Sequence, residues 1–186
     1  MKKVIVLTAL FVATVVSAQS TWKADNAHSK VGFAITHLMI SEVEGHFGEF
    51  DITATADEAF SEPDFTVDIK TASIDTDNDK RDNDLKSDHF FDVATYPSIS
   101  FKSTTFEKTG DKTFKLTGDL TMHGVTKPVT LEGKLNGIIT DQRSQKLKAG
   151  LKLTGTINRL DFMVGGESPM VGNDVNMNIN LEMAQQ

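Results

Sequence analysis

The 186-residue chain contains no cysteine, four prolines, one tryptophan and one tyrosine. The absence of cysteine excludes disulfides, a cysteine nucleophile, and the lipid anchor that bacterial lipoproteins attach to a cysteine after their leader. There is also no Gly-x-Ser-x-Gly elbow, and no serine stands in a recognisable triad context. Stability must therefore come from a buried apolar core, and the sequence indicates no catalytic residue and no cofactor.

Long apolar runs are almost as scarce, since the chain has one, near its N-terminus. Lys2 and Lys3 precede an uncharged apolar run over residues 4–16, and the small residues Ser17 and Ala18 follow it. This order of regions predicts a secretory signal peptide over residues 1–18 and a mature domain over residues 19–186. The run is shorter than the roughly 20 residues that span a bilayer. We therefore expect no stable membrane anchor and a periplasmic or secreted protein.

Positive charge is in short supply, with 19 Lys and Arg against 26 Asp and Glu. The formal charge is -7, and loss of Lys2 and Lys3 with the leader makes it -9. A chain this acidic disfavours nucleic acid, whose phosphates bind basic surfaces, and also disfavours anionic lipid surfaces. We expect no nucleic-acid partner, and a ligand that is either neutral or held by a local cation.

Apolar residues beyond the leader recur at every second position, which is the period of a half-buried strand. The clearest runs cover residues 65–69, 114–122, 129–135, 147–157 and 175–183. Clean alternation favours antiparallel pairing, and turn-forming stretches separate the runs. We predict one all-β domain of roughly eight antiparallel strands, folded as a sandwich or a barrel. Residues 78–93 break the alternation and are expected to form a short helix.

Two patterns resemble metal sites, and both fall short of a recognised motif. Asp75, Asp77 and Asp79 alternate like the opening of an EF-hand loop, but Lys80 and Lys86 occupy the positions that need glycine and glutamate. We interpret this stretch as a solvated acidic turn that leads into a helix. The five histidines are scattered and lack the pairing and the flanking glutamate of zinc enzymes. We therefore expect no metal site.

Phenylalanine, in contrast, is abundant, with 12 residues. Most of these lie on the apolar face of a predicted strand, as core residues do. Gly118, Gly133 and Gly155 lie on the same faces, where they let a strand bend or leave room for a guest molecule. The pattern therefore fits either a packed core or a container for a long apolar ligand.

The order of short motifs along the chain resembles that of the YceI-like family. The motifs that carry the resemblance are Trp22-x-x-Asp25-x-x-His28-Ser29-x-Val31-x-Phe33-x-x-x-His37, Val43-x-Gly45-x-Phe47-x-x-Phe50, Arg81-Asp82-x-x-Leu85-x-Ser87-x-x-Phe90-Phe91-Asp92, Tyr96-Pro97-x-Ile99-x-Phe101, Gly118-x-Leu120-Thr121-x-x-Gly124-Val125-Thr126-x-Pro128-Val129 and Ile157-Asn158-Arg159-x-Asp161-Phe162. The resemblance covers nearly all of the mature chain. It implies a lipocalin-like antiparallel barrel that is periplasmic or secreted, binds polyisoprenoid or other long-chain amphiphiles inside, and has no catalytic activity.

The chain departs from the family's pattern at two positions. Asp84 stands where the family often has histidine, which removes any contact that a histidine there would make with a ligand head group. Met163 stands where the family has glycine after the Asp-Phe pair, and we expect it to narrow or reshape the adjoining cavity wall.

Under this interpretation the helical segment closes part of the barrel and apolar side chains line the lumen. The expected lining residues are Phe33, Ile35, Phe47, Phe50, Val67, Ile69, Leu85, Phe90, Phe91, Ile99 and Phe101. We expect the ligand to be an isoprenoid quinone, a polyprenyl phosphate or another long-chain lipid, with its polar head near His37, Arg81 and Arg159. Arg81 has a second interpretation, in which it forms a fork-like pair with Asp82, Asp84 or Asp161. A homodimer is also expected, to shield a cavity that opens at one end.

Two alternatives remain open from the sequence. A lipid-modifying hydrolase would use Arg81, Asp82 and His89, which are close in the chain. A solid β-barrel with a filled lumen would serve protein contacts instead.

Overall fold

The computed structural model describes residues 18–186, so the expected signal peptide lies outside the described residues except for Ala18. Within these residues the alternating runs form strands, joined by turns, with one α-helix and two short 3-10 helices. In chain order the elements are β1 (Ser20–Ala24), β2 (Lys30–His37), β3 (Ser41–Phe47), β4 (Phe50–Ala56), β5 (Asp64–Lys70), η1 (Thr71–Ser73), β6 (Ile74–Asp75), α1 (Asp79–Lys86), β7 (Ser98–Lys108), β8 (Thr113–Met122), β9 (Val125–Thr140), β10 (Leu147–Asn158), η2 (Arg159–Phe162) and β11 (Val171–Gln185).

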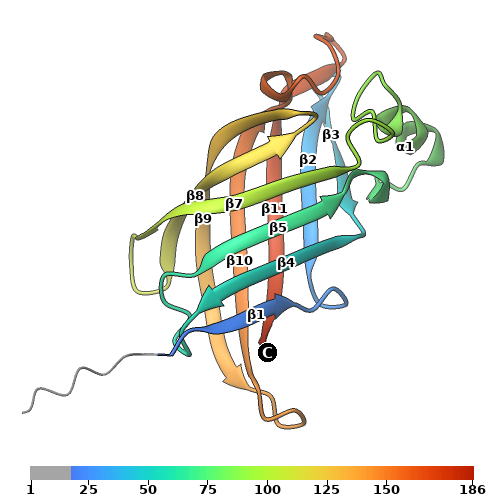
Figure 1. Ribbon diagram of the computed structural model, residues 1–186. Coiled ribbons are helices and arrows are strands. Elements are labelled where there is room, and N and C mark those ends of the chain that lie inside the picture. The colour runs from blue at the N-terminus through green and yellow to red at the C-terminus, as the bar shows by residue number, and fades with distance from the viewer. Residues whose placement is uncertain (1–17) are drawn as a thin grey trace, which may run out of the picture.

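Eight strands close into an antiparallel barrel, as the resemblance implied and as the alternation allowed (Figure 1). Their order around the ring is β1-β4-β5-β7-β8-β9-β10-β11, and β11 pairs again with β1. The barrel closes through a short stretch of pairing between β1 and β11, in which Trp22 lies opposite Gln185 and Ala24 opposite Met183. The barrel prediction is therefore confirmed and the sandwich alternative is wrong.

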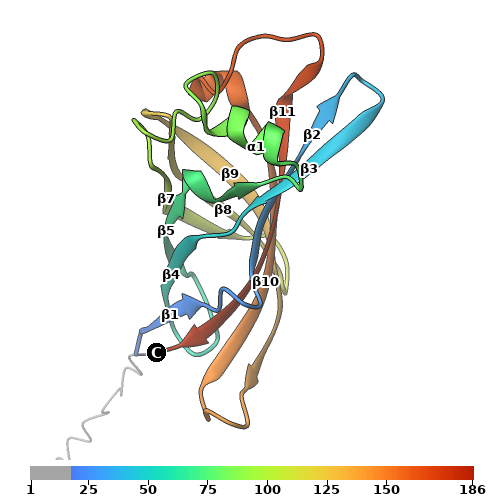
Figure 2. The same cartoon turned by 90° about the vertical axis from the view of Figure 1, so that its right-hand side faces the viewer.

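The strands β2, β3 and β6 extend one side of this barrel beyond the ring (Figure 2). β2 pairs with the same edge of β11 as β1 does, but nearer the start of β11, from Val171 to Asn180. β2 and β3 form a hairpin in which His37 lies opposite Ser41, and the short β6 pairs with the end of β3. The hairpin projects at the same end of the barrel as α1 and the loop that precedes β11 (Figures 1 and 2).

The opposite end of the barrel is plugged by core side chains. Trp22 is fully buried, packs edge-on against Phe60 with 5.0 Å between ring centroids, and donates its indole N–H to the Ala56 carbonyl at 3.4 Å. Ala149 and Met183 are also fully buried. A tryptophan buries a large apolar area and finds a hydrogen-bond partner when it does so, which makes this end solid.

At three glycines that were expected to make room for a bend or a ligand, the protein's own side chains fill the space. A Cβ at Gly118 would collide with the ring of Phe101, and one at Gly133 would collide with the ring of Phe114. At Gly155 two aliphatic side chains occupy the equivalent volume. The idea that these glycines make room for a guest is therefore wrong, because alternation places a residue on the inner face without showing what packs over it.

The helical segment begins where the sequence predicted and is shorter than expected. The Asn78 side chain accepts the backbone N–H of Arg81 at 3.0 Å, which caps α1. Asp75 accepts the N–H of Asp77 at 2.8 Å, so the stretch that imitates an EF-hand is an acidic turn before a helix, as interpreted. α1 ends at Lys86, and no helix among residues 18–186 is long and apolar enough to cross a membrane.

After α1 the chain folds back in a series of turns rather than continuing as a helix to residue 93. The Ser87 hydroxyl donates to the Asp84 carbonyl at 2.7 Å, and Phe91 N–H returns to the Leu85 carbonyl at 3.0 Å. Asp92, with φ of 42°, then turns the backbone toward β7. This return path directs two adjacent phenylalanines toward the open end of the barrel.

Candidate ligand-binding cavity

A cavity of about 360 Å³ occupies the barrel interior on the open side of the plug. Aliphatic and phenylalanine side chains from most of the strands form its wall. The polar side chains that reach it are few, and they come from the end of the barrel that carries α1: Thr36, His37, Thr76, Arg81, Asp84 and Arg159. A lumen of this size contradicts the alternative of a solid barrel. Its volume lies at the lower end of the range of small-molecule sites.

The structure brings most of the expected lining residues together around this cavity. Those that line it are Phe33, Ile35, Phe47, Val67, Ile69, Leu85, Phe90, Phe91, Ile99 and Phe101, together with His37, Arg81 and Arg159. Phe50 is the exception, because its ring is buried within the core cluster and does not border the cavity. Many further lining residues that sequence reasoning missed come from the long strands of the far wall, among them Leu131, Leu153 and Ile179. The alternation of these residues was visible in the sequence, but residues that pack in a core and residues that line a cavity show the same alternation.

Aromatic rings from β2, β3 and the segment after α1 meet at one side of the cavity. Phe47 lies between Phe33 and Phe91, with ring centroids at 5.8 Å and 6.0 Å, and it meets Phe91 edge-on. Phe90 packs against Gly165, where an added Cβ would lie 2.8 Å from its ring. Gly165 has φ of +69°, a conformation that side chains rarely adopt. The segment after α1 and the loop before β11 therefore touch across the mouth of the cavity.

Arg81 is anchored by a threonine and not by a carboxylate. Its Nε donates to Thr76 Oγ1 at 2.7 Å and its Nη2 donates to the Thr76 carbonyl at 2.6 Å. The Thr76 hydroxyl in turn donates to Asp82 Oδ1 at 2.5 Å. The expected fork-like pair of Arg81 with Asp82, Asp84 or Asp161 is therefore wrong, because Thr76 relays the contact to Asp82, and Asp161 pairs with Lys127 at 3.0 Å. Within residues 18–186, Nη1 of Arg81 has no hydrogen-bond partner.

Arg159 is a buried cation that neutral oxygens surround. Only 4% of its surface is exposed, and burial lowers the pKa of its guanidinium. It donates to the carbonyls of Val164, Gly166 and Gly172 at 2.9 Å each, and to Asn173 Oδ1 at 3.2 Å. Among the described residues it forms no ion pair with a carboxylate. Arg159 therefore holds the loop before β11 in place, and few of its N–H groups remain for a ligand.

The residues of the hydrolase alternative do not converge on a reaction site. Asp82 is buried and accepts hydrogen bonds from the backbone and the hydroxyl of Thr76. His89 is exposed and faces Asp84, with 3.6 Å between Nδ1 and Oδ1. Because Asp82 points to Thr76 and His89 points outward, neither is placed to move a proton for the other.

A model of the YceI-like domain matches residues 22–183. Protein YceI from Escherichia coli O6:H1 (strain CFT073) is 39% identical over 183 residues, covering 95% of each chain. The chain belongs to the YceI-like family. The crystal structure of a Campylobacter jejuni YCEI protein, 36% identical, superposes with a TM-score of 0.72 and covers 87% of this chain and 96% of that one. A polyisoprenoid binding domain from Saccharophagus degradans, implicated in plant cell wall breakdown, shares the fold, with a TM-score of 0.64, 14% identity, and coverage of 89% and 98%.

The two departures of this YceI-like chain from the family's pattern have different consequences. Met163 is the residue after η2, has φ of 58°, and exposes 67% of its surface. It does not border the cavity, so the expected narrowing of the wall is wrong. Its left-handed backbone explains why glycine suits this position. Asp84 does border the cavity, where it adds a carboxylate to the polar end and pairs with His89.

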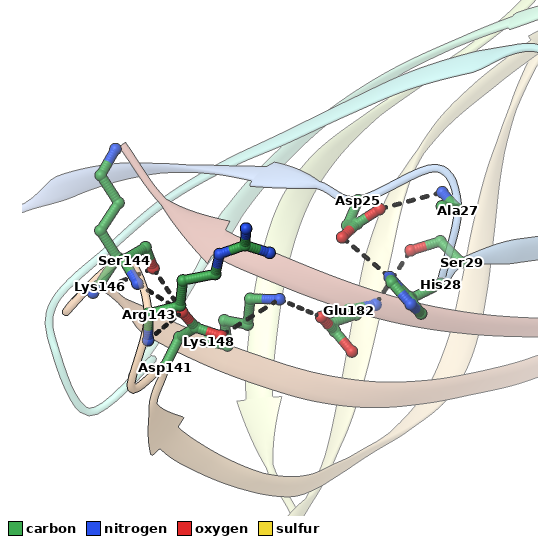
Figure 3. A network of polar contacts seen from close by, with 10 residues as sticks. All are labelled: Asp25, Ala27, His28, Ser29, Asp141, Arg143, Ser144, Lys146, Lys148 and Glu182. Carbon is green, nitrogen blue, oxygen red and sulfur yellow. Dashed lines mark hydrogen bonds and ion pairs between the residues drawn. The ribbon is translucent and has the colours of Figure 1, made fainter.

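A polar network that sequence reasoning missed lies at the plugged end of this YceI-like barrel (Figure 3). His28 Nδ1 lies 3.0 Å from Asp25 Oδ2, and Lys148 Nζ lies 2.7 Å from Glu182 Oε1. The side-chain ligand atoms of Asp25, His28 and Glu182 all lie within 4.8 Å of one another. These residues are up to 157 positions apart in the chain, so no local pattern connects them. The network fastens the β1–β2 turn to β10 and β11.

The pKa values in this network shift in the directions that its contacts require. The hydrogen bond between the two side chains raises the pKa of His28 and lowers the pKa of Asp25. The hydrogen bond to Glu182 raises the pKa of Lys148. Each shift favours the charged form of its group, so Asp25, His28 and Lys148 stabilise the network most when they are ionised.

Proposed function

We propose that this protein is exported and binds a long-chain isoprenoid lipid inside its barrel without catalysing a reaction. The observation that carries the proposal is the cavity, whose wall is almost wholly apolar and whose polar side chains are collected at one end. An amphiphile with a long tail and a small polar head has the same distribution. Membership of the YceI-like family, and a fold shared with a polyisoprenoid binding domain, support the same ligand class.

The driving force for binding is burial of the lipid tail. Each Å² of apolar surface removed from water contributes roughly 25 cal/mol, so a tail that buries a few hundred Å² outweighs the association cost of several kcal/mol. The wall offers few directional polar groups, and selectivity among tails of different length should therefore be modest. Selectivity for the head group falls to the polar end of the cavity.

Arg81 is the group that would contact an anionic head. It lines the cavity, is held in place by Thr76, and has an Nη1 without a partner among the described residues. A polyprenyl phosphate would accept hydrogen bonds from that nitrogen. A quinone head could instead accept a single hydrogen bond from Arg81 or from His37, which also lines the cavity.

The ligand class is tested by extraction. The protein is purified from the compartment to which the host exports it, treated with organic solvent, and the extract is examined by mass spectrometry. We expect a long-chain isoprenoid in independent preparations, and uptake of an added isoprenoid quinone by the emptied protein. Repeated recovery of no lipid, together with no uptake, contradicts the proposal.

Export and oligomeric state are separate parts of the proposal. Intact mass of the purified protein should show the loss of residues 1–18, and its presence in the periplasm or the medium should accompany that loss. Sedimentation with and without bound lipid measures whether the protein forms the expected homodimer. A full-length mass in the cytoplasm contradicts export, and a monomer under both conditions contradicts the dimer.

A further inference from the structure

Exposed apolar side chains gather around the mouth of the cavity. Leu38, Met39, Ile40, Met163 and Met170, which we call the mouth rim, each expose between 47% and 85% of their surface. They lie on the β2–β3 turn and on the loop between η2 and β11, which occupy the same end of the barrel (Figures 1 and 2). The two segments touch, since Leu38 N–H donates to the Met170 carbonyl at 2.8 Å. Of the large apolar side chains exposed within residues 18–186, Ile139 alone lies elsewhere.

The β2–β3 turn carries residues poorly suited to its backbone. Leu38 and Met39 have φ of 51° and 59°, and Ile40 N–H donates to the His37 carbonyl at 3.2 Å. A turn with two central residues at positive φ favours Asn-Gly, because a Cβ clashes in this conformation. Two apolar side chains at such positions, both facing water, are unfavourable in the isolated molecule. Strained and exposed positions of this kind point to a role outside folding.

The mouth rim is continuous with the cavity. Thr36, His37 and Val171 border the cavity, and they lie within one or two residues of Leu38 and Met170. Arg159 holds the loop that carries Met170 through its hydrogen bonds to the carbonyls of residues 164, 166 and 172. A surface that receives the rim would therefore lie directly over the route into the lumen.

The acidic residues near the mouth rim indicate which kind of surface could cover it. Residues 37–44 and 163–174 include Glu42, Glu44, Glu167 and Asp174, and no lysine or arginine. α1, at the same end, carries three acidic and three basic residues, so this end of the barrel stays acidic. Two copies placed mouth to mouth would bring these carboxylates together, which disfavours a homodimer that covers the mouth and leaves the other faces for the proposed dimer. An anionic lipid surface would also repel these carboxylates. A zwitterionic lipid surface carries no net charge and accepts apolar side chains at the boundary between head groups and acyl chains.

We propose that the mouth rim inserts into the surface of a zwitterionic bilayer, so that the cavity opens toward the lipid phase. The proposal deepens the lipid-binding function and rests on it for its purpose, but insertion itself needs only the rim. Sparingly soluble lipids would then enter and leave without crossing water. Attachment is shallow and reversible, because five side chains on two loops do the binding.

The test is flotation of the ligand-free exported protein with phosphatidylcholine vesicles, after intact mass has shown that residues 1–18 are gone. The rim variant is L38N/M39G/I40T. It installs the Asn-Gly pair that the turn favours and keeps a β-branched residue at 40, so the fold is maintained or stabilised. The control is Ile139→Thr, which removes an apolar side chain of comparable exposure, 64%, from β9 at the other end of the barrel.

We expect the protein and the Ile139→Thr control to float equally, and the rim variant to partition at least about tenfold less. Addition of phosphatidylglycerol to the vesicles should weaken binding at low salt. No flotation, equal flotation of all three proteins, or a requirement for phosphatidylglycerol would overturn the proposal. Loss of a dimer in the rim variant, with no vesicle binding by the parent protein, would also overturn it and assign the rim to a contact between copies.

A cavity-filling substitution separates this proposal from lipid binding. Val67→Trp places an indole in the lumen and leaves the rim intact. We expect this variant to lose uptake of isoprenoid quinone and to keep vesicle flotation. If the parent protein takes up no quinone but still floats, lipid binding fails while rim insertion stands. If Val67→Trp loses flotation while it remains folded, insertion depends on the lumen and the rim proposal fails.

Discussion

Arg159 donates four hydrogen bonds to neutral oxygens of residues 164–173, whereas the guanidinium of Arg81 is held, within residues 18–186, by Thr76 alone. Both arginines stand in motifs that were visible in the sequence, and both border the cavity. The sequence could not distinguish them, because the partners of Arg159 are mostly backbone carbonyls of a loop with no marker in its side chains. At the scale of single residues, sequence reasoning therefore found the polar site but did not show which arginine supports the fold and which can contact a ligand.

Substitution of Arg81 should affect anionic ligands more than neutral ones. A hydrogen bond to a charged group contributes about 1.5–3 kcal/mol, so Arg81→Ala should weaken polyprenyl phosphate binding by roughly ten- to a hundredfold and quinone binding much less. Salt should reduce the phosphate affinity of the unaltered protein. Titration calorimetry with both ligands measures the difference, and Arg143→Ala, in the exposed β9–β10 turn, is the control. Equal losses for the two ligands would show that Arg81 only supports the fold.

Substitution of Arg159 should act on stability. Arg159→Lys keeps the charge but cannot reproduce the planar set of donors, which leaves buried carbonyls without partners. We expect the free energy of unfolding to fall by about 2 kcal/mol or more, with similar effects on the binding of phosphate and quinone ligands. Denaturant titration measures the loss. A change below about 0.5 kcal/mol would contradict the clamp that we assign to this residue.

The Asp25–His28 pair predicts a specific pH dependence. Its hydrogen bond raises the pKa of His28 above the ordinary value of 6.5, so the stabilisation is present below that pH and is lost as pH rises through the folded-state pKa. The same bond lowers the pKa of Asp25 below 3.8, so its stabilisation is lost as pH falls through the folded-state value. The thermal midpoint of His28→Ala should fall furthest below that of the parent protein near about pH 5, and the gap should shrink toward about pH 8. The gap should be small, since the pair is largely exposed.

Asp25→Asn provides the background that isolates this pair. In the Asp25→Asn protein, the effect of His28→Ala on the thermal midpoint should depend much less on pH, because the largest cause of the raised His28 pKa is gone and only the attraction of Glu182 still raises it. A pH-dependent gap of undiminished size in this background would show that the Asp25–His28 pair is not its source and would assign the effect to Glu182, whose charge also raises the pKa of His28.

At the scale of elements, α1 shows what local pattern can and cannot predict. The break in alternation placed the helix, and Asn78 at its start is a residue type that caps helices. The helix was predicted to continue to residue 93 but ends at Lys86, because Ser87 and Asp92 turn the chain through local hydrogen bonds. The sequence did not show this end, since both residue types also occur within helices. The strands were predicted well wherever one face is buried, whereas closure into a barrel came from the family resemblance alone, since no local pattern shows the pairing of Trp22 with Gln185.

Removal of the helix cap should loosen the cover of the cavity without unfolding the barrel. Asn78→Ala loses the hydrogen bond to Arg81 N–H and should destabilise α1 by about 1 kcal/mol. Asn83→Ala, at an exposed position in the same helix, is the control, because alanine is the better helix former there. Hydrogen exchange should accelerate over residues 79–86 in Asn78→Ala alone, with β9 and β10 unchanged. Equal exchange in the two variants would mean that the cap contributes nothing to α1.

At the scale of the whole molecule, one barrel combines a solid end and a hollow end. Trp22 and its neighbours fill the first, and the cavity with its phenylalanine cover forms the second. The sequence predicted which residues face inward. It could not predict that Phe50 packs in the core while Phe47 borders the cavity, because three-dimensional packing decides which inward positions meet empty space.

The central claim, that the lumen itself is the lipid site, is tested most directly by titration of an isoprenoid quinone into three proteins. Val67 borders the cavity and its neighbour Thr66 is exposed on the outer face of β5. The parent protein and Thr66→Trp should bind the quinone equally, and Val67→Trp, which fills the lumen, should bind it at least about tenfold more weakly, or about 1.4 kcal/mol. Thermal melts should show that all three proteins are folded. Equal binding by three folded proteins, or no binding by the parent protein, would contradict the claim.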